Sequence, residues 1–282
     1  MRAMASRRAF SELRGIQSIE LGCRVLSVLA RASGAMGLTE LAKASAMSPS
    51  KARRYLISFT RAGFIEQDGA TGSYDLGWFA LRLGLAAQSR SDVVRLSRAL
   101  LTELRGALNE TVALVMWVGD RPTVVHIEES DRSIIRLVAP VGGPLQLLTT
   151  AGGMIFAAFL PERISGPLIE QELREFARQA PQTKVVRSKR EAERVLGEVR
   201  RRGVARAYPV VSTSICTLAA PIFDAQGAVT AALVAIGYKS NFDARLDGKV
   251  ATAIKAAALQ LSQRLGYGAM QFSKTEREVG RG

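Results

Sequence analysis

MSPSKARRYLISFTRAGFI, residues 47–65, decides the fold of the N-terminal part of this chain. It opens with Ser-Pro, an order typical of a helix that has a serine N-cap and proline in its first turn. Apolar residues then recur with helical spacing, whereas Lys51, Arg53 and Arg54 fall toward the opposite side. The stretch holds no Asp or Glu, and Gly63 ends the pattern. It therefore predicts an amphipathic helix with one basic face.

Two shorter helices are predicted before this one, and a hairpin is predicted after it. Ser18 is expected to cap a helix that runs to Arg31, and Thr39 to cap a second, short helix. The segments 64–67 and 73–77 read as brief strands around the turn-rich DGATG. Three helices and a hairpin are the order of a winged helix-turn-helix, in which the third helix enters the major groove and the hairpin loop touches the neighbouring backbone.

The basic helix has two interpretations. A solvated surface helix is the simpler one, but the order of helices, caps and turns favours DNA binding. On the second interpretation, we expect DNA contacts from side chains on or beside the helix-turn-helix: Thr39, Ser48, Ser50, Lys51, Arg53, Arg54 and Ser58.

The pattern changes along the rest of the chain. Residues 74–110 read as helices, and strand-like segments begin at Thr111. Three amphipathic or buried helices, a strand pair joined at Asp224–Gly227 and a closing helix follow. The expected fold is α+β, with an antiparallel sheet flanked by helices. The expected parts are a disordered tail over 1–14, the winged helix-turn-helix over 15–85, a linker helix over 86–110, the sheet domain over 111–267 and a second disordered tail over 268–282.

Composition bounds the class of protein. The chain has 282 residues, 48% of them hydrophobic, and a formal net charge of +14, which suits a polyanionic partner. Its two cysteines, Cys23 and Cys216, lie far apart and predict no disulfide, so a reduced cytoplasm is the expected location. The longest apolar runs are too short to span a membrane. A single histidine, His126, excludes a histidine-based triad or a multi-histidine metal site, and no cofactor is expected.

Several stretches resemble the IclR family of bacterial transcription regulators. They are SIELGCRVLSVLA, GLTELAKASAMSPSKARRYLISFTRAGFIEQD, GSYDLGWFALRLG, RRGVARAYPVV and TLAAPIFDAQGAVTAALVAIG, and the similarity covers residues 15–267. The resemblance implies a winged helix that binds operator DNA and a GAF-like domain that binds a small effector. It also implies a homodimer or a dimer of dimers.

The resemblance also places an effector pocket, with departures from the family pattern. The run QLLTTAGGM keeps a small, helix-starting character but puts Gln146, Leu148 and Met154 where family members usually carry proline, histidine and a basic residue. Polar pocket positions of members that sense small oxoacids match Ala207, Thr217, Val234 and Ile236 here. A larger, partly apolar ligand, such as an aromatic or lactone-like compound, is therefore expected. The predicted contacts are Thr149, Thr150, Ala151, Gly152, Gly153, Thr217, Val234 and Ile236.

Three alternatives stay open at this point. In the first alternative, the pocket residues fill the core of a domain that has lost its ligand. In the second, the C-terminal domain is an enzyme with Thr217 or Cys216 as nucleophile. In the third, the protein is an adaptor that does not contact DNA. The sequence shows no general base near either nucleophile, which argues against the enzyme.

Overall fold

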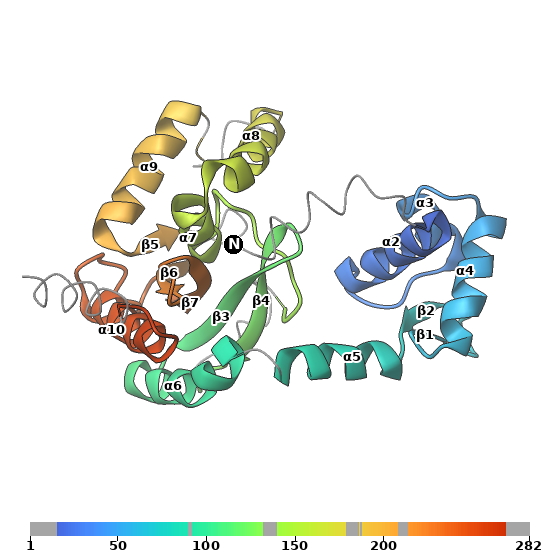
Figure 1. The fold of residues 1–282 in the computed structure, drawn as a ribbon, viewed down its shortest axis with the longest axis horizontal. Helices are drawn as coiled ribbons and strands as arrows, with labels where there is room; N and C mark the ends of the chain where they lie inside the picture. The colour runs from blue at the N-terminus through green and yellow to red at the C-terminus, as the bar shows by residue number, and fades with distance from the viewer. Residues whose placement is uncertain are drawn as a thin grey trace, which may run out of the picture. The chain divides into compact units, whose positions relative to one another are not determined.

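The computed structural model describes residues 16–89, 92–131, 140–178, 186, 188–207 and 214–268. Within these ranges the chain forms two compact units that divide after Gln88, and each is described by itself (Figure 1). The predicted tails, apart from Gly268, lie outside the described residues, as do residues 134–139 of the strand-like segments predicted after Thr111.

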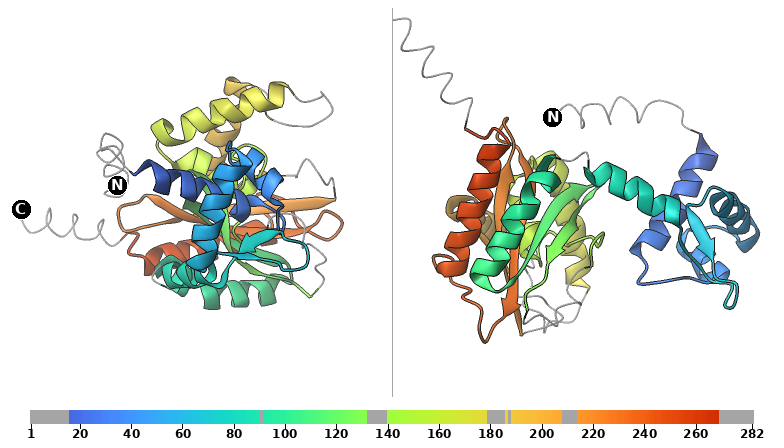
Figure 2. Two further views of the ribbon diagram at one scale, coloured as in Figure 1. Left: turned by 90° about the vertical axis from the view of Figure 1, so that its right-hand side faces the viewer. Right: turned by 90° about the horizontal axis from the view of Figure 1, so that it is seen from below.

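The first unit consists of three helices, a hairpin and a further helix. The elements are α2 (Gln17–Arg31), α3 (Leu38–Ala44), α4 (Pro49–Arg61), β1 (Ile65–Gln67), β2 (Tyr74–Leu76) and α5 (Trp78–Ser89). Strands β1 and β2 pair antiparallel, with Glu66 opposite Asp75, and Figure 2 shows this hairpin from two sides. The order confirms the predicted winged helix-turn-helix.

A small core holds this unit together. Each of its first five elements contributes at least one buried side chain, so detachment of any one of them would expose apolar surface to water. The members are Val25 and Leu29 from α2, Leu41 from α3, Leu56 from α4, Ile65 from β1 and Tyr74 from β2, with Met36 from the loop before α3.

The observed N-termini of the first three helices agree only in part with the caps predicted from the sequence. Ser48 caps α4 as predicted, since its Oγ accepts the Lys51 N–H at 3.4 Å. Ser18 and Thr39 do not cap: each lies inside the first turn of its helix. Ile16 and Gly37 take the N-cap positions, and their extended backbones place a carbonyl oxygen for the first helical hydrogen bond without any side-chain acceptor.

The second unit is a five-stranded antiparallel sheet with helices on both faces, which confirms the predicted fold class. Its strands are ordered β4-β3-β7-β6-β5. The elements are α6 (Asp92–Leu108), β3 (Thr111–Val118), β4 (Arg121–Glu128), α7 (Ala151–Phe159), α8 (Glu162–Ala177), α9 (Lys189–Arg202), β5 (Ala205–Ala207), β6 (Ile215–Phe223), β7 (Val229–Tyr238) and α10 (Lys249–Arg264).

The two faces of the sheet carry side chains of different size. The face toward α6 and α10 holds larger residues, including Leu114, Leu218 and Leu233. The face toward α7 holds smaller ones, including Ala219 and Val234. Because helices cover both faces, β3, β6 and β7 are buried on both sides and lose the usual polar alternation of antiparallel strands.

Helix α6 belongs to this second unit. Its buried Leu100, Leu101 and Leu104 join the core between the sheet and α10, and Figure 2 shows α6 beside α10. The helix expected within the linker over 86–110 is therefore packed as a core element over most of its length.

Helix α7 is almost entirely buried between the sheet and the helices α8 and α9. Two consecutive glycines allow this close approach. A Cβ at Gly152 would lie 3.3 Å from Val115 and from Val234, and a Cβ at Gly153 would overlap the Gln146 carbonyl oxygen. The start of α7 therefore has no room for a side chain at position 153.

The Gly153→Ala variant tests this packing. We expect it to lower the free energy of unfolding by about 1–3 kcal/mol, because the new methyl group must displace the backbone of the preceding loop. The matched control is Gly197→Ala in α9, whose Cβ would meet only Arg201 Nη1, at 3.6 Å. That change should raise the free energy of unfolding by about 0.5–1 kcal/mol. Urea unfolding measures both, and equal effects would contradict the packing described.

Candidate nucleic-acid interface and ligand site

One stripe of α4 faces away from the core of the first unit. Ser50, Arg54, Ile57 and Arg61 share it, because they are spaced by four, three and four residues along the helix. All four are exposed, and 44% of the Ile57 surface is accessible. Arg53 is also exposed, beside this stripe, whereas Lys51 is half-buried.

Three predicted contacts on α4 already have hydrogen bonds within the helix. Ser48 Oγ caps the helix and lies 3.3 Å from Ser50 Oγ, and Ser58 Oγ donates to the Arg54 carbonyl oxygen at 3.1 Å. Thr39 is exposed in the first turn of α3. Ile57 and Arg61 lie on the same stripe as Ser50 and Arg54 and were not among the predicted contacts, although their spacing in the sequence was sufficient to identify them.

The wing carries the opposite charge. Between Arg61 and Arg82 the sequence contains Glu66, Asp68 and Asp75 and no Lys or Arg. Asp68 holds the tip of the hairpin: its Oδ1 accepts hydrogen bonds from the Ala70 and Thr71 N–H groups and from the Thr71 hydroxyl. These bonds hold the pKa of Asp68 below its usual value. Favourable charge toward a phosphate backbone is therefore concentrated on α4, not on the wing.

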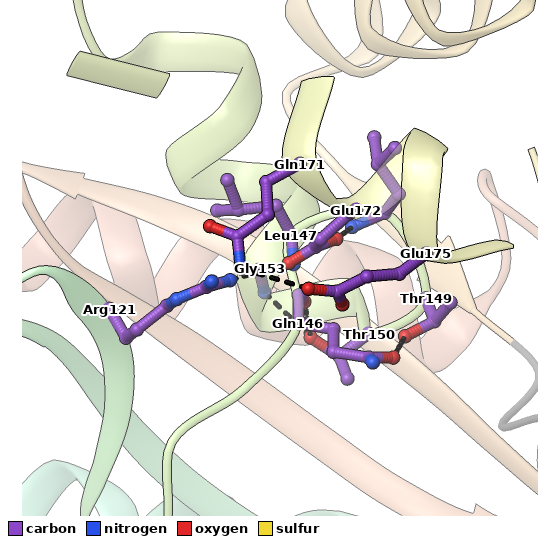
Figure 3. Close-up of polar contacts among 10 residues, drawn as sticks. Arg121, Gln146, Leu147, Thr149, Thr150, Gly153, Gln171, Glu172 and Glu175 are labelled. Atoms are coloured by element: carbon purple, nitrogen blue, oxygen red, sulfur yellow. Dashed lines mark hydrogen bonds and ion pairs between the residues drawn. The ribbon is translucent and has the colours of Figure 1, made fainter. Parts of the chain in front are cut away.

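In the second unit, a loop over residues 145–150, here called the effector loop, leads into α7. Thr150 caps the helix: its Oγ1 accepts the Gly153 N–H at 3.0 Å and donates to the Gln146 carbonyl oxygen at 2.6 Å. Thr149 Oγ1 donates to Gln146 Oε1 at 2.5 Å (Figure 3). The Gly153 N–H is thus already bound within the protein.

A buried carboxylate from α8 holds the other side of this loop. Only 1% of Glu172 is exposed. Its Oε1 accepts the Leu147 N–H at 2.8 Å and Arg121 Nη1 at 2.9 Å, and its Oε2 accepts the Leu148 N–H at 3.0 Å. Figure 3 shows Arg121 and Glu172 pointing toward one another beside Leu147.

Burial raises the pKa of Glu172 above its usual value. The hydrogen bonds from Leu147 and Leu148 and the charge of Arg121 act in the opposite direction, and the nearby Glu175 adds to the increase. Sequence reasoning missed Glu172. Helical spacing already placed it on the apolar face of α8, four residues from both Leu168 and Phe176, but its partners lie far away in the sequence.

The sheet brings together the remaining predicted pocket residues. Thr217 pairs with Ile236, and Val234 pairs with Ala219 on the same two strands. Thr217 and Val234 are buried, Ile236 is half-buried, and the Thr217 hydroxyl donates to the Ala207 carbonyl oxygen at 3.2 Å. Val234 lies directly under Gly152. The structure thus places the predicted effector residues around the start of α7, over the small-residue face of the sheet.

The strand register separates this pocket from the Glu172 cluster. Along β3, Thr111 pairs with Ile236, Val115 lies under Gly152, and Val118 at the other end pairs with Arg121. Arg121 and the Thr217–Ile236 pair therefore lie toward opposite ends of the strands, with the start of α7 between them. Glu172 holds the effector loop from the side away from Thr217 and Ile236.

Features expected of an enzyme are scarce in the part of the chain that the structure describes. His126 Nε2 lies 2.8 Å from Glu128 Oε1 on β4, and Cys216 is buried and forms no disulfide. No group of three metal-ligating side chains occurs among the described residues. None of the described helices is long and apolar enough to cross a membrane.

Comparison with known proteins identifies the family. The family model for the IclR helix-turn-helix domain matches residues 18–69, and the model for the bacterial transcriptional regulator IclR C-terminal region matches residues 85–263. The chain belongs to the IclR family. It is therefore a DNA-binding transcriptional regulator, built from the two units described above.

Individual proteins similar to this chain match it over nearly its whole length. The transcriptional repressor IclR of Escherichia coli strain K12 is 27% identical over 91% of this chain and 92% of its own length. The crystal structure of Pseudomonas aeruginosa HmgR is 38% identical, covers 90% of this chain and 99% of its own, and has a TM-score of 0.55. An IclR homologue from Microbacterium hydrocarbonoxydans, solved with 4-hydroxybenzoate, is 20% identical to this chain. The match covers 88% of this chain and 98% of the homologue, with a TM-score of 0.69.

Proposed function

We propose that α4 reads operator DNA and that a small, partly apolar organic effector, bound between the effector loop and the sheet, changes operator occupancy. The observation that carries the DNA part is the exposed basic stripe of α4, held at a fixed angle by a capped helix-turn-helix. The observation that carries the effector part is the loop and glycine-rich helix start over a face of small side chains.

The chemistry of the α4 stripe suits the major groove. Arg53, Arg54 and Arg61 supply cations that bind phosphates or pair with guanine edges. Ile57 offers an apolar surface for a thymine methyl group. The acidic wing lacks cations and has only hydroxyl and backbone N–H groups to offer, so α4 supplies most of the salt-dependent affinity of the first unit.

The pocket residues favour an effector larger than a two- or three-carbon acid. The described side chains around the start of α7 are mostly Ala, Val, Ile and Thr, which cannot compensate a desolvated charge on a small acid. An aromatic or lactone-like ring fits such a lining. The homologue solved with 4-hydroxybenzoate supports the idea that the family fold accommodates an aromatic acid.

A dimer would complete the mechanism. An operator with two half-sites needs two α4 helices at fixed spacing, so a modest change in their placement alters affinity. Helix α5 supplies a surface for self-association: Trp78, Leu81 and Leu85 are spaced by three and four residues, and each is more than half exposed. In water such a helix is stabilised by covering its leucines with a second copy.

The Arg53→Ala/Arg54→Ala variant tests the DNA part. Fluorescence anisotropy on the intergenic DNA beside the gene should show tight, sequence-selective binding for the wild type. Because two cations are removed, the variant should bind at least tenfold more weakly, and the slope of log affinity against log salt should fall by about 2.

The charge-matched control for that experiment is Arg24→Ala/Arg31→Ala on α2, which should bind within about threefold of the wild type. Equal losses in both double variants would mean that net charge, and not α4, drives binding. Wild-type binding that is equal on random DNA would contradict the proposal and would favour an adaptor that does not contact DNA.

The Leu81→Glu variant tests the dimer. Sedimentation velocity should find the wild type as a dimer or tetramer and the variant shifted toward monomer, because a buried, unpaired carboxylate opposes association. The control is Leu259→Glu on α10, a leucine that is 49% exposed and outside the proposed surface. An unchanged assembly state in Leu81→Glu would place the self-association surface elsewhere.

A further inference from the structure

Glu172 connects three segments that are distant in the sequence. Its carboxylate on α8 binds Arg121 at the start of β4 and two consecutive backbone amides of the effector loop. Two of these partners lie 24 and 25 residues from it, and the third lies 51 residues away. One buried side chain therefore fixes the position of α8 relative to the loop and to the edge of the sheet.

The loop depends on this carboxylate for its hydrogen bonding. Leu147 and Leu148 are buried, so water is not available to their N–H groups. A buried amide without a partner costs about 1–3 kcal/mol. Among the described contacts, Glu172 alone accepts from these two N–H groups. The opposite side of the loop is held separately, through Gln146 and Thr150.

We propose that Glu172 is the positioning residue of the effector loop, and that its ionised carboxylate fastens the loop to α8 so that protonation loosens the loop. This inference rests on the proposed function for its biological meaning, because the loop is where the effector is expected to bind. Glu172 lies on the far side of the loop from Thr217 and Ile236, so it acts on effector binding through the loop.

The way the carboxylate is bonded explains the sensitivity to protonation. Oε1 accepts two hydrogen bonds, from Arg121 and Leu147, whereas Oε2 accepts one, from Leu148. A proton is therefore accommodated on Oε2, where it weakens the bond from the Leu148 N–H. The charged groups that act on Glu172 are Arg121 on β4 and Glu175 on α8, and the sequences of the loop and of α7 contain none.

The sign of the pH dependence follows from burial. Because the pKa of Glu172 is raised in the folded protein, the folded chain binds this proton at a higher pH than the unfolded chain does. Its contribution to folding stability is present below pH 4.5 and is lost as the pH rises through the folded pKa. Through this one group, acidification favours the folded state while it weakens the hold on Leu148.

Amide NMR of the full chain from pH 4.5 to 8 tests the proposal without any effector. The Leu147 and Leu148 amide signals of the wild type should titrate with a midpoint above 4.5, the ordinary pKa of a glutamate. Glu172→Gln should abolish that transition. In this variant, amide hydrogen exchange over 147–153 should rise at least tenfold relative to the rest of the unit, since the neutral amide binds the loop more weakly.

The matched control is Glu175→Gln, one turn along α8. It should keep the transition and shift its midpoint to lower pH, because the negative charge of Glu175 raises the pKa of Glu172. Operator affinity without effector should stay within twofold in both variants. The conservative Glu172→Asp change, whose side chain is shorter, should retain a titration with partial protection of the loop.

Three results would overturn the proposal: no titration at Leu147 and Leu148, the same titration in Glu172→Gln, or an exchange increase spread evenly over the second unit. A wild type that titrates as described but does not bind operator DNA would contradict the proposed function and leave the role of Glu172 intact. The two claims therefore fail independently.

Discussion

The second unit depends on one constraint: helix α7 is buried along nearly its whole length, so every polar group at its start must find a partner inside the protein. Thr150 provides the cap, and Gly152 and Gly153 let the helix approach the sheet and the loop. The loop that delivers the helix is fixed by Gln146 on one side and by Glu172 on the other.

The sheet supports the same arrangement through the size of its side chains. Large residues such as Leu218 and Leu233 fill the space toward α6 and α10, where two long amphipathic helices pack. Small residues such as Ala219 and Val234 face α7, and they let the glycine-containing start of that helix approach the sheet closely. In the first unit, by contrast, one small core holds the three helices and the hairpin together.

Much of this architecture could be predicted from local signals. The Ser-Pro cap at Ser48 and the wing depend on neighbouring residues, and the structure confirms them. The cap expected at Thr39 was wrong, because a helix start needs only an extended residue that supplies a carbonyl oxygen, and Gly37 does so. Ile57 could have been found from helical spacing. The same spacing places Glu172 on the apolar face of α8, but its partners could not be predicted, because they lie 24 to 51 residues away in the sequence.

Selection of bound sequences from a random DNA pool, with the wild type and with Arg54→Ala, tests the central claim most directly. A dimer that reads DNA through α4 should enrich an inverted repeat whose half-sites lie about one helical turn, or a multiple of it, apart. The variant should lose preference at one position in each half-site and keep the others. No enriched sequence, or a preference unchanged by the variant, would contradict the assignment of α4 as the helix that reads the operator.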